Sequence, residues 1–326
     1  RSPDKTFINV FEAPKDSVST FDGIKVRVGG SSTLQFQAIN HENSGAVELI
    51  EIGDNFNLAT ANLDLDVALA KGVRMHLRTY LSSRHHPEPY VKGGYLQVDN
   101  LDFISPGFLE NTMKYVTVKV GHMENNYGDA HFRRTDNAQA MHNPFVGNLI
   151  MDAFTTEVGG EVYFRKNGFI GMFGLSNGKL NQAVTNPDAT GASILAKLGY
   201  DGQINEDLRL RLTGSMYSTN KSGRVYLYSA DRAGSRYYLV MEDTEASATS
   251  NFRSGRYNPG FNNEITAFMI NPFVKYKGLE FFGTIETASG KTNAETEDRK
   301  ATQLAGELIY RFGNNENYYL GARYNT

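Results

Sequence analysis

Residues 207–217 read DLRLRLTGSMY, and this stretch decides the fold class of the chain. Leu208, Leu210 and Leu212 share one face of an extended strand, whereas Arg209 and Arg211 share the other. A helix would spread leucine and arginine around its circumference, so the period of two predicts a β-strand with one apolar and one polar face. The same alternation recurs at 61–69 and 73–81 and along almost the whole sequence.

Neighbouring strands are predicted to pair into hairpins in which both faces match. Across the turn at 70–72, Val67 falls opposite Met75 on the apolar face, and Asp64 falls opposite Arg78 on the polar face. Three further turns combine an apolar face with one of the charge pairs Lys275–Glu280, Glu307–Arg323 and Asp201–Arg209. Because facing opposite charges stabilise a sheet by roughly 0.2–1 kcal/mol a pair, the repeated match indicates an antiparallel sheet.

The connections between strands alternate between short and long. Short turns lie near residues 71, 167, 205, 277 and 315, and long polar connections such as 125–152 and 220–262 lie between them. Short turns at one end and long loops at the other are typical of an all-β, antiparallel transmembrane β-barrel with periplasmic turns and external loops. The pattern predicts strands at 23–40, 56–70, 73–83, 91–103, 114–124, 154–165, 168–177, 193–204, 207–219, 263–276, 279–290, 299–312 and 317–325. Since strand numbers in such barrels are usually even, we expect about 16 strands, within a range of 14–18.

Composition separates this barrel from other classes of protein. The 33 Lys and Arg residues against 36 Asp and Glu argue against a nucleic-acid partner. The lack of cysteine removes disulfides, thiolate metal sites and cysteine nucleophiles. No segment approaches the ~18 apolar residues of a membrane helix. A soluble β-sandwich also alternates, but its strands are usually ~5–6 residues long, so the longer strands here favour a barrel in the bacterial outer membrane.

The faces of the predicted strands divide into a lipid-facing set and an inward set. The lipid-facing set is Leu63, Leu65, Val73, Leu77, Leu208, Leu210, Leu212, Phe281, Ile285 and Leu308. The inward charged set is Arg74, Arg78, Lys119, Arg209 and Arg211 with Asp64, Asp66, Glu157, Glu161, Glu280, Glu286 and Glu307. The two signs nearly cancel in the inward set, which favours a broad diffusion pore over a strict anion filter.

The domain division is simple. Residues 1–22 are predicted to form a polar lead-in, and residues 23–326 one barrel domain. A barrel in lipid must pair every strand edge, and the strands recognised in the sequence leave the last one without a partner. We expect the chain to continue past Thr326; the alternative is that residues 6–13 (TFINVFEA) add a strand.

The connection 125–152, NNYGDAHFRRTDNAQAMHNPFVGNLIMD, is the third long loop. Loops of this length without secondary structure are usually functional or disordered. Its aromatic and aliphatic residues favour a segment that folds inward and narrows the pore; the alternative is an exposed surface loop. We expect Arg133 and Arg134 to lie near the constriction, with Asp129 and Asp136 as opposing acids.

Three stretches carry a resemblance to a known family. They are YVTVKVGH at 115–122 with the long loop that follows, residues 157–178, and LAGELIYRF with NYYLGARYNT within 304–326. The chain resembles trimeric bacterial porins, specifically the phosphate-selective porin O and P family and related general porins. The resemblance implies a homotrimer, a third loop folded into the barrel, and basic residues that guide anions.

The expected function is therefore passive diffusion of small hydrophilic solutes or ions, anions included, through a water-filled pore. We expect no enzyme activity, cofactor or metal site, and outer-membrane lipid as the surrounding partner. One alternative is a receptor or interaction barrel that binds an envelope protein through loop 220–262 as a subunit of a larger complex. A second is an outer-membrane hydrolase, although no histidine stands in a recognisable nucleophile context.

Overall fold

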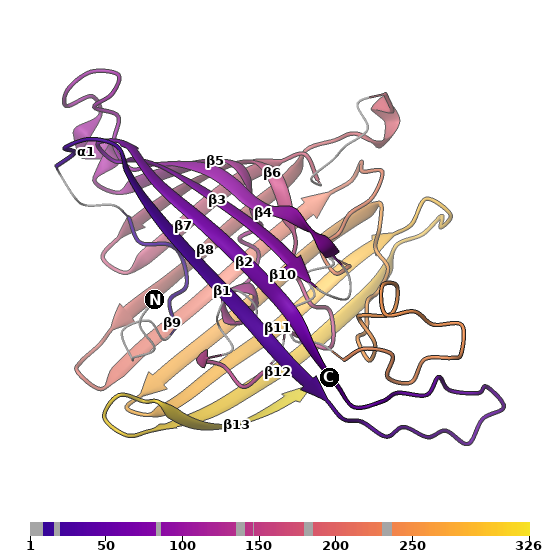
Figure 1. Ribbon diagram of the computed structural model, residues 1–326. Coiled ribbons are helices and arrows are strands. Elements are labelled where there is room, and N and C mark those ends of the chain that lie inside the picture. Colours follow the sequence, from indigo (N-terminus) through magenta and orange to yellow (C-terminus); the bar gives the residue numbers. More distant parts are fainter. Residues whose placement is uncertain are drawn as a thin grey trace.

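The computed structural model describes residues 9–15, 20–82, 86–134, 141–145, 147–178, 185–229 and 237–326. Across these residues, thirteen strands form one antiparallel sheet in sequence order (Figure 1). They are β1 Lys25–Gln37, β2 Asn55–Ala70, β3 Val73–Ser82, β4 His86–Val98, β5 Val116–Glu124, β6 Thr156–Lys166, β7 Phe169–Ser176, β8 Ser193–Gln203, β9 Leu208–Thr219, β10 Glu264–Tyr276, β11 Leu279–Lys291, β12 Arg299–Phe312 and β13 Tyr318–Asn325. Each predicted segment overlaps one of these strands.

Short helices lie in three of the connections. They are α1 Glu110–Met113 between β4 and β5, η1 Ala130–Arg133 between β5 and β6, and η3 Pro187–Ala189 between β7 and β8. Among the described helices, none has the length and apolar character needed to cross a bilayer.

Three of the four predicted hairpin registers are confirmed. The confirmed cross-strand partners are Asp64–Arg78, Lys275–Glu280 and Glu307–Arg323. The register predicted between β8 and β9 is wrong by two residues, because Asp201 lies opposite Arg211. In the turn between these strands, the Asn205 side chain accepts hydrogen bonds from two backbone N–H groups, both at 3.0 Å, and so centres the turn one residue later than predicted. A shift of two residues keeps every side chain on its predicted face.

Apolar side chains cover the outer face of the sheet. Leu212, Ile285 and Leu308 are 55%, 50% and 50% exposed, whereas Arg211 and Glu286, which neighbour the first two along their strands, are each 2% exposed. A continuous apolar exterior of this kind is unfavourable in water and is satisfied by hydrocarbon. The strands therefore present their apolar faces to lipid and their charged faces to the interior.

The remaining members of the predicted lipid-facing set follow the same division, with one exception. Leu63 and Phe281 are exposed, and Leu65, Leu77, Leu208 and Leu210 are half-buried on the outer faces of their strands. Val73 is buried, so its prediction was wrong. The connection after β4 begins beside this residue, where the Asp99 N–H donates to the Gly72 carbonyl at 2.7 Å.

Aromatic side chains mark the end of the barrel that carries the short turns. Exposed rings stand within a few residues of these turns on β6, β7, β8, β10, β12 and β13: Phe164, Phe169, Tyr200, Tyr276, Tyr310, Phe312 and Tyr318. Outer-membrane barrels carry such aromatic girdles where the bilayer meets water. The girdle identifies the short-turn end as one membrane interface.

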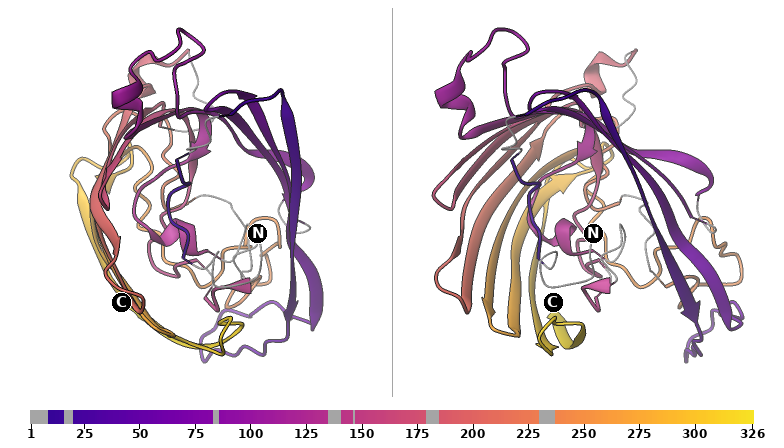
Figure 2. Two further views of the ribbon diagram at one scale, coloured as in Figure 1. Left: turned by 90° about the vertical axis from the view of Figure 1, so that its left-hand side faces the viewer. Right: turned by 60° about the vertical axis from the view of Figure 1, so that its left-hand side comes forward.

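The sheet curves around an interior that the chain itself occupies (Figure 2). Residues 9–15 and parts of the connection between β5 and β6 lie inside the curve. The inward face of the first part of β10 is apolar, with Ile265, Ala267 and Met269 at most 1% exposed, and these residues belong to a buried cluster with Tyr127 and Met151 from the loop 125–152. The loop is thus packed against this part of the wall through apolar contacts, which the sequence did not indicate.

Strands β1 and β13 are the two edges of the sheet, and no pairing between them occurs within the described residues. The alternative that residues 6–13 add a strand is not supported where it can be judged, because residues 9–13 have no strand structure. The expected strands beyond the thirteen remain a prediction.

Candidate functional site: the charged interior

The loop 125–152 is tied to the inner wall through Asp129. Both Asp129 oxygens accept from the Arg211 guanidinium on β9, at 2.8 and 2.9 Å, and one also lies 2.9 Å from the Lys197 ammonium on β8. Thr213 donates a further hydrogen bond at 2.7 Å, and all three charged side chains are fully buried. A buried bidentate pair of this kind fixes both position and orientation, so this part of the loop is held against β8 and β9.

Arg133 ties the same loop to β11 and β12, further along the same wall. Its guanidinium donates to Glu280 on β11 at 2.9 Å and to Glu307 on β12 at 3.3 Å. Glu280 also accepts from Arg311 at 2.9 Å, and the Arg323 side chain donates to Glu307 at 2.5 Å. These charges form one continuous network from the loop to β13.

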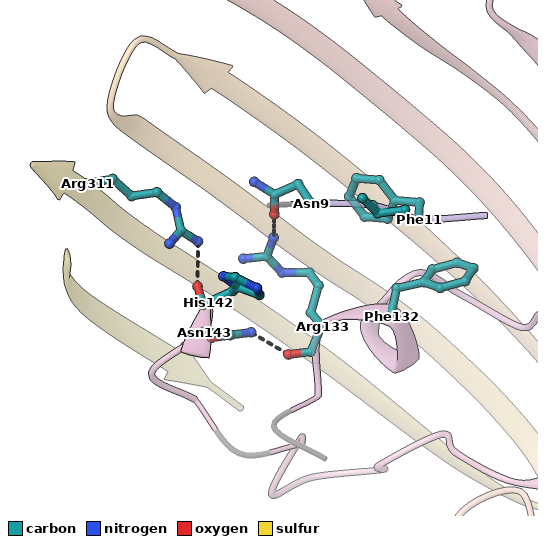
Figure 3. A pocket seen from close by; sticks show the side chains of 8 residues that line it. Asn9, Phe11, Phe132, Arg133, His142, Asn143 and Arg311 are labelled. Atoms are coloured by element: carbon teal, nitrogen blue, oxygen red, sulfur yellow. Dashed lines mark hydrogen bonds between the residues drawn. The ribbon is translucent and has the colours of Figure 1, made fainter. Parts of the chain in front are cut away.

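A small cavity lies beside this network (Figure 3). Its lining is Asn9, Val10, Phe11, Phe132, Arg133, His142, Asn143 and Arg311. Its volume of about 20 Å³ has room for about one water molecule.

Arg134 is the third charged residue of the loop 125–152 that has a buried ion-pair partner. Its guanidinium donates to Asp152 at 2.5 Å and lies 4.2 Å from the ring centre of Phe154. Arg256, from the loop 220–262, also reaches Asp152 at 3.4 Å. Arg134 thus joins the start and end of its own loop, close to where a second loop packs.

The loop 220–262 also packs inward over much of its described length. Val225, Leu227 and Tyr228 are at most 3% exposed and belong to the buried cluster inside the sheet. Tyr257 forms an isolated parallel bridge with Ile150 of the loop 125–152. The two long loops therefore support each other.

Five other predicted inward charges lie on β2, β3 and β5: Asp64, Asp66, Arg74, Arg78 and Lys119. Arg78 forms two hydrogen bonds with Asp64, at 2.5 and 3.0 Å, and Asp66 accepts from His76 at 2.7 Å. These residues are half-buried.

The two remaining predicted residues of this wall have partners of other kinds. Arg74 donates to the Pro14 carbonyl at 2.9 Å. The Lys119 ammonium lies 5.3 and 5.0 Å from the ring centres of Tyr95 and Tyr163. The predicted set is thus divided between two places: Asp129, Arg133, Arg209, Arg211, Glu280 and Glu307 meet in the interior, whereas Asp64, Asp66, Arg74, Arg78 and Lys119 lie along another part of the wall. Asp136 lies outside the described residues.

The structure adds site residues that the sequence did not single out. Lys197 and Arg311 occupy inward positions of alternating strands, so the period of two could have identified them. Asn9 and Glu12 lie in a segment with no periodic pattern, and no sequence signal indicated their position.

The charges of the loop persist at neutral pH. Burial alone would raise the pKa of Asp129, but Lys197 and Arg211 outweigh burial and hold that pKa below its ordinary value of 3.8. Burial alone would lower the pKa of Arg133, but Glu280 and Glu307 outweigh it and raise the pKa. The interior is therefore a set of fixed ionic contacts, which can act on a passing ion through their fields.

The fold and its interior define a class: an antiparallel transmembrane β-barrel of the outer-membrane type, with long loops folded inward. Among solved structures, the chain is similar to the anion-selective porin from Comamonas acidovorans, with 12% identity, a TM-score of 0.49, and coverage of 93% of this chain and 78% of that chain. It is also similar to Salmonella typhi OmpF in complex with daunomycin (8% identity, TM-score 0.39, 93% and 97% coverage) and to the trimer form of Vibrio cholerae OmpT (10% identity, TM-score 0.38, 93% and 89% coverage). At these identities and TM-scores the likeness does not identify a function. No family model and no curated protein matches the chain.

Proposed function

We propose that the protein is an outer-membrane porin through which small hydrophilic solutes or ions diffuse passively, and that the loop 125–152 narrows its pore. One observation carries the proposal: the loop lies inside the curve of the sheet, with Asp129 ion-paired to Arg211 of β9 and Arg133 ion-paired to Glu280 of β11. An exposed surface loop would have no reason to place these charges against Arg211 and Glu280. Their burial supports a structural constriction.

Charges beside a narrow aqueous passage act strongly on ions, because the low-dielectric wall confines their field. Arg133 and Arg134 contribute two positive charges to the loop. Many of the basic residues of the interior are paired with carboxylates, which supports a broad diffusion pore in preference to a strict filter for phosphate. The proposed lining and constriction set is the predicted one, extended by Lys197 and Arg311.

The test is ion selectivity in planar bilayers. We expect the wild-type protein to conduct, and the double variant Arg133→Ala, Arg134→Ala to shift its reversal potential in a salt gradient toward cations. Lys114→Ala, which removes an exposed positive charge directly after α1, is the control and should leave the potential unchanged. Equal reversal potentials for the wild type and the double variant, with both proteins folded, would contradict the proposed constriction.

A receptor or interaction barrel is the second candidate. It is favoured by three large apolar side chains that the loop 220–262 leaves exposed: Tyr237 at 47%, Met241 at 56% and Tyr257 at 54%. Such side chains are common anchors in protein interfaces. Folded protein that never conducts in bilayers would favour this function over the pore. We also propose a homotrimer, which the mass of the detergent-solubilised protein would test.

A further inference from the structure

Residues 9–15, called the inner segment below, run through the interior ahead of β1 (Figure 2). Wall side chains hold the backbone of this segment at several points. Arg209 of β9 donates to the Asn9 carbonyl at 3.1 Å, and Arg165 of β6 donates to the Ala13 carbonyl at 2.8 Å. Together with the contact between Arg74 and Pro14, these bonds fix the segment to three different strands.

One end of the inner segment is anchored near the short-turn end of the barrel. The Lys15 ammonium donates to the backbone carbonyls of Asp99 and Val116, at 2.8 and 2.7 Å. These two residues stand where β4 has ended and β5 begins. From this anchor the segment extends inward to Asn9, which meets the loop 125–152.

The other end of the segment contacts the proposed constriction directly. Asn9 accepts a hydrogen bond from Arg133 at 2.5 Å and donates one to Glu280 at 2.7 Å (Figure 3). Phe11 is buried, with ring-centre distances of 5.4 Å to Phe273 and 6.0 Å to Phe132. The segment therefore fills space between the wall and the loop.

Glu12 joins the charges at the base of the loop. It accepts from Arg211 at 2.8 Å and lies 3.5 Å from the Lys197 ammonium, and its side chain is 5% exposed. Both cations also contact Asp129. Glu12 and Asp129 thus share the same two positive charges, one carboxylate from the inner segment and one from the loop.

We propose that the inner segment is a second element of the constriction, which narrows the pore from the short-turn end, and that Glu12 is a selectivity-determining residue. This inference rests on the proposed porin function. Its physical basis is that one carboxylate removed from a confined passage leaves Lys197 and Arg211 less neutralised, which favours anions. The direction is opposite to that expected for the loss of Arg133.

Two variants test the inference in the full-length protein. In the first, residues 9–15 are replaced by a glycine-serine linker of equal length; in the second, Glu12→Gln removes one charge and keeps the shape. Asp22→Asn is the matched control, since Asp22 is exposed and pairs with exposed Lys25. Heat-dependent migration in gel electrophoresis verifies that each barrel has folded.

We expect the linker variant to conduct severalfold more current per channel than the wild type, because the segment no longer fills the passage. Glu12→Gln should shift the reversal potential toward anions, and Asp22→Asn should not. The Arg133 variant could change selectivity while the linker variant keeps the wild-type conductance and Glu12→Gln keeps the wild-type reversal potential. That result would overturn this inference and leave the porin function standing. A folded wild type and a folded linker variant that both fail to conduct would overturn the porin function as well.

Discussion

Asp129 of the loop 125–152 and Arg211 of β9 form two hydrogen bonds, at 2.8 and 2.9 Å, with both side chains fully buried. The pair joins a connection that lacks regular structure to a strand of the wall. Burying two charges is costly, and the geometry offsets that cost only while both partners are present. The position of the loop therefore depends on this contact.

Asp129→Asn should destabilise the protein, because the buried cations Arg211 and Lys197 then lack the charge of this carboxylate. Removing one partner of a buried ion pair costs about 3–5 kcal/mol, and here both Arg211 and Lys197 lose a carboxylate. The free energy of unfolding, measured by urea titration in detergent, should fall accordingly. Asp207→Asn, at an exposed pair 3.7 Å from Lys277, is the control and should change little. Equal unfolding midpoints for the two variants would refute the proposed anchoring role.

Leu212→Arg tests the lipid-facing assignment. Leu212 is 55% exposed on the outer face of β9. An arginine that faces lipid costs roughly 2–4 kcal/mol at the bilayer midplane and about 0–1 kcal/mol near the interfaces. Because Leu212 pairs with Tyr200 of the girdle, we expect a loss between these limits, seen as a lower free energy of unfolding from lipid vesicles. The same arginine placed at Glu206, in the exposed turn between β8 and β9, should cost much less. Wild-type stability for Leu212→Arg would mean that this face does not contact hydrocarbon.

Acid should release the inner segment. Burial alone would raise the pKa of Glu12, but Lys197 and Arg211 outweigh burial and lower it from 4.5 to about 2. Because the pKa is lower in the docked state, the contribution of Glu12 is fully present above pH 4.5 and is lost as the pH falls toward about 2. Single-channel conductance should rise across this window, and part of the rise should be missing in Glu12→Gln. Identical pH profiles for the two proteins would argue against this role of Glu12.

Asp64→Asn should change stability very little, in contrast to Asp129→Asn. The Asp64–Arg78 pair is partly exposed, with side-chain exposures of 19% and 21%, and pairs that water can screen contribute about 0–1 kcal/mol. The comparison of the two variants by urea titration separates a wall pair from a loop anchor. A loss for Asp64→Asn as large as that for Asp129→Asn would show that water does not reach this part of the wall.

Much of the fold was predictable because a strand repeats every two residues. The alternation in 207–217 placed Arg211 inward and Leu212 outward correctly, even where the predicted register with β8 was wrong by two residues. Parity survives such an error, since a shift of two returns each side chain to the same face. A shift of two residues does change which residue lies directly opposite on the neighbouring strand, because that pairing depends on the local turn around Asn205.

The sequence by itself determined the strands and, with the exception of Val73, their lipid-facing and inward faces, and it favoured an inward-folded loop 125–152 over an exposed one. Only the tertiary structure decided which charges meet. Glu12 lies far from Lys197 and Arg211 along the chain and in a segment without periodicity, so no local rule links them. Their contact arises because the curve of the sheet brings β8, β9 and the inner segment together in the interior, where each buried charge must find an opposite one.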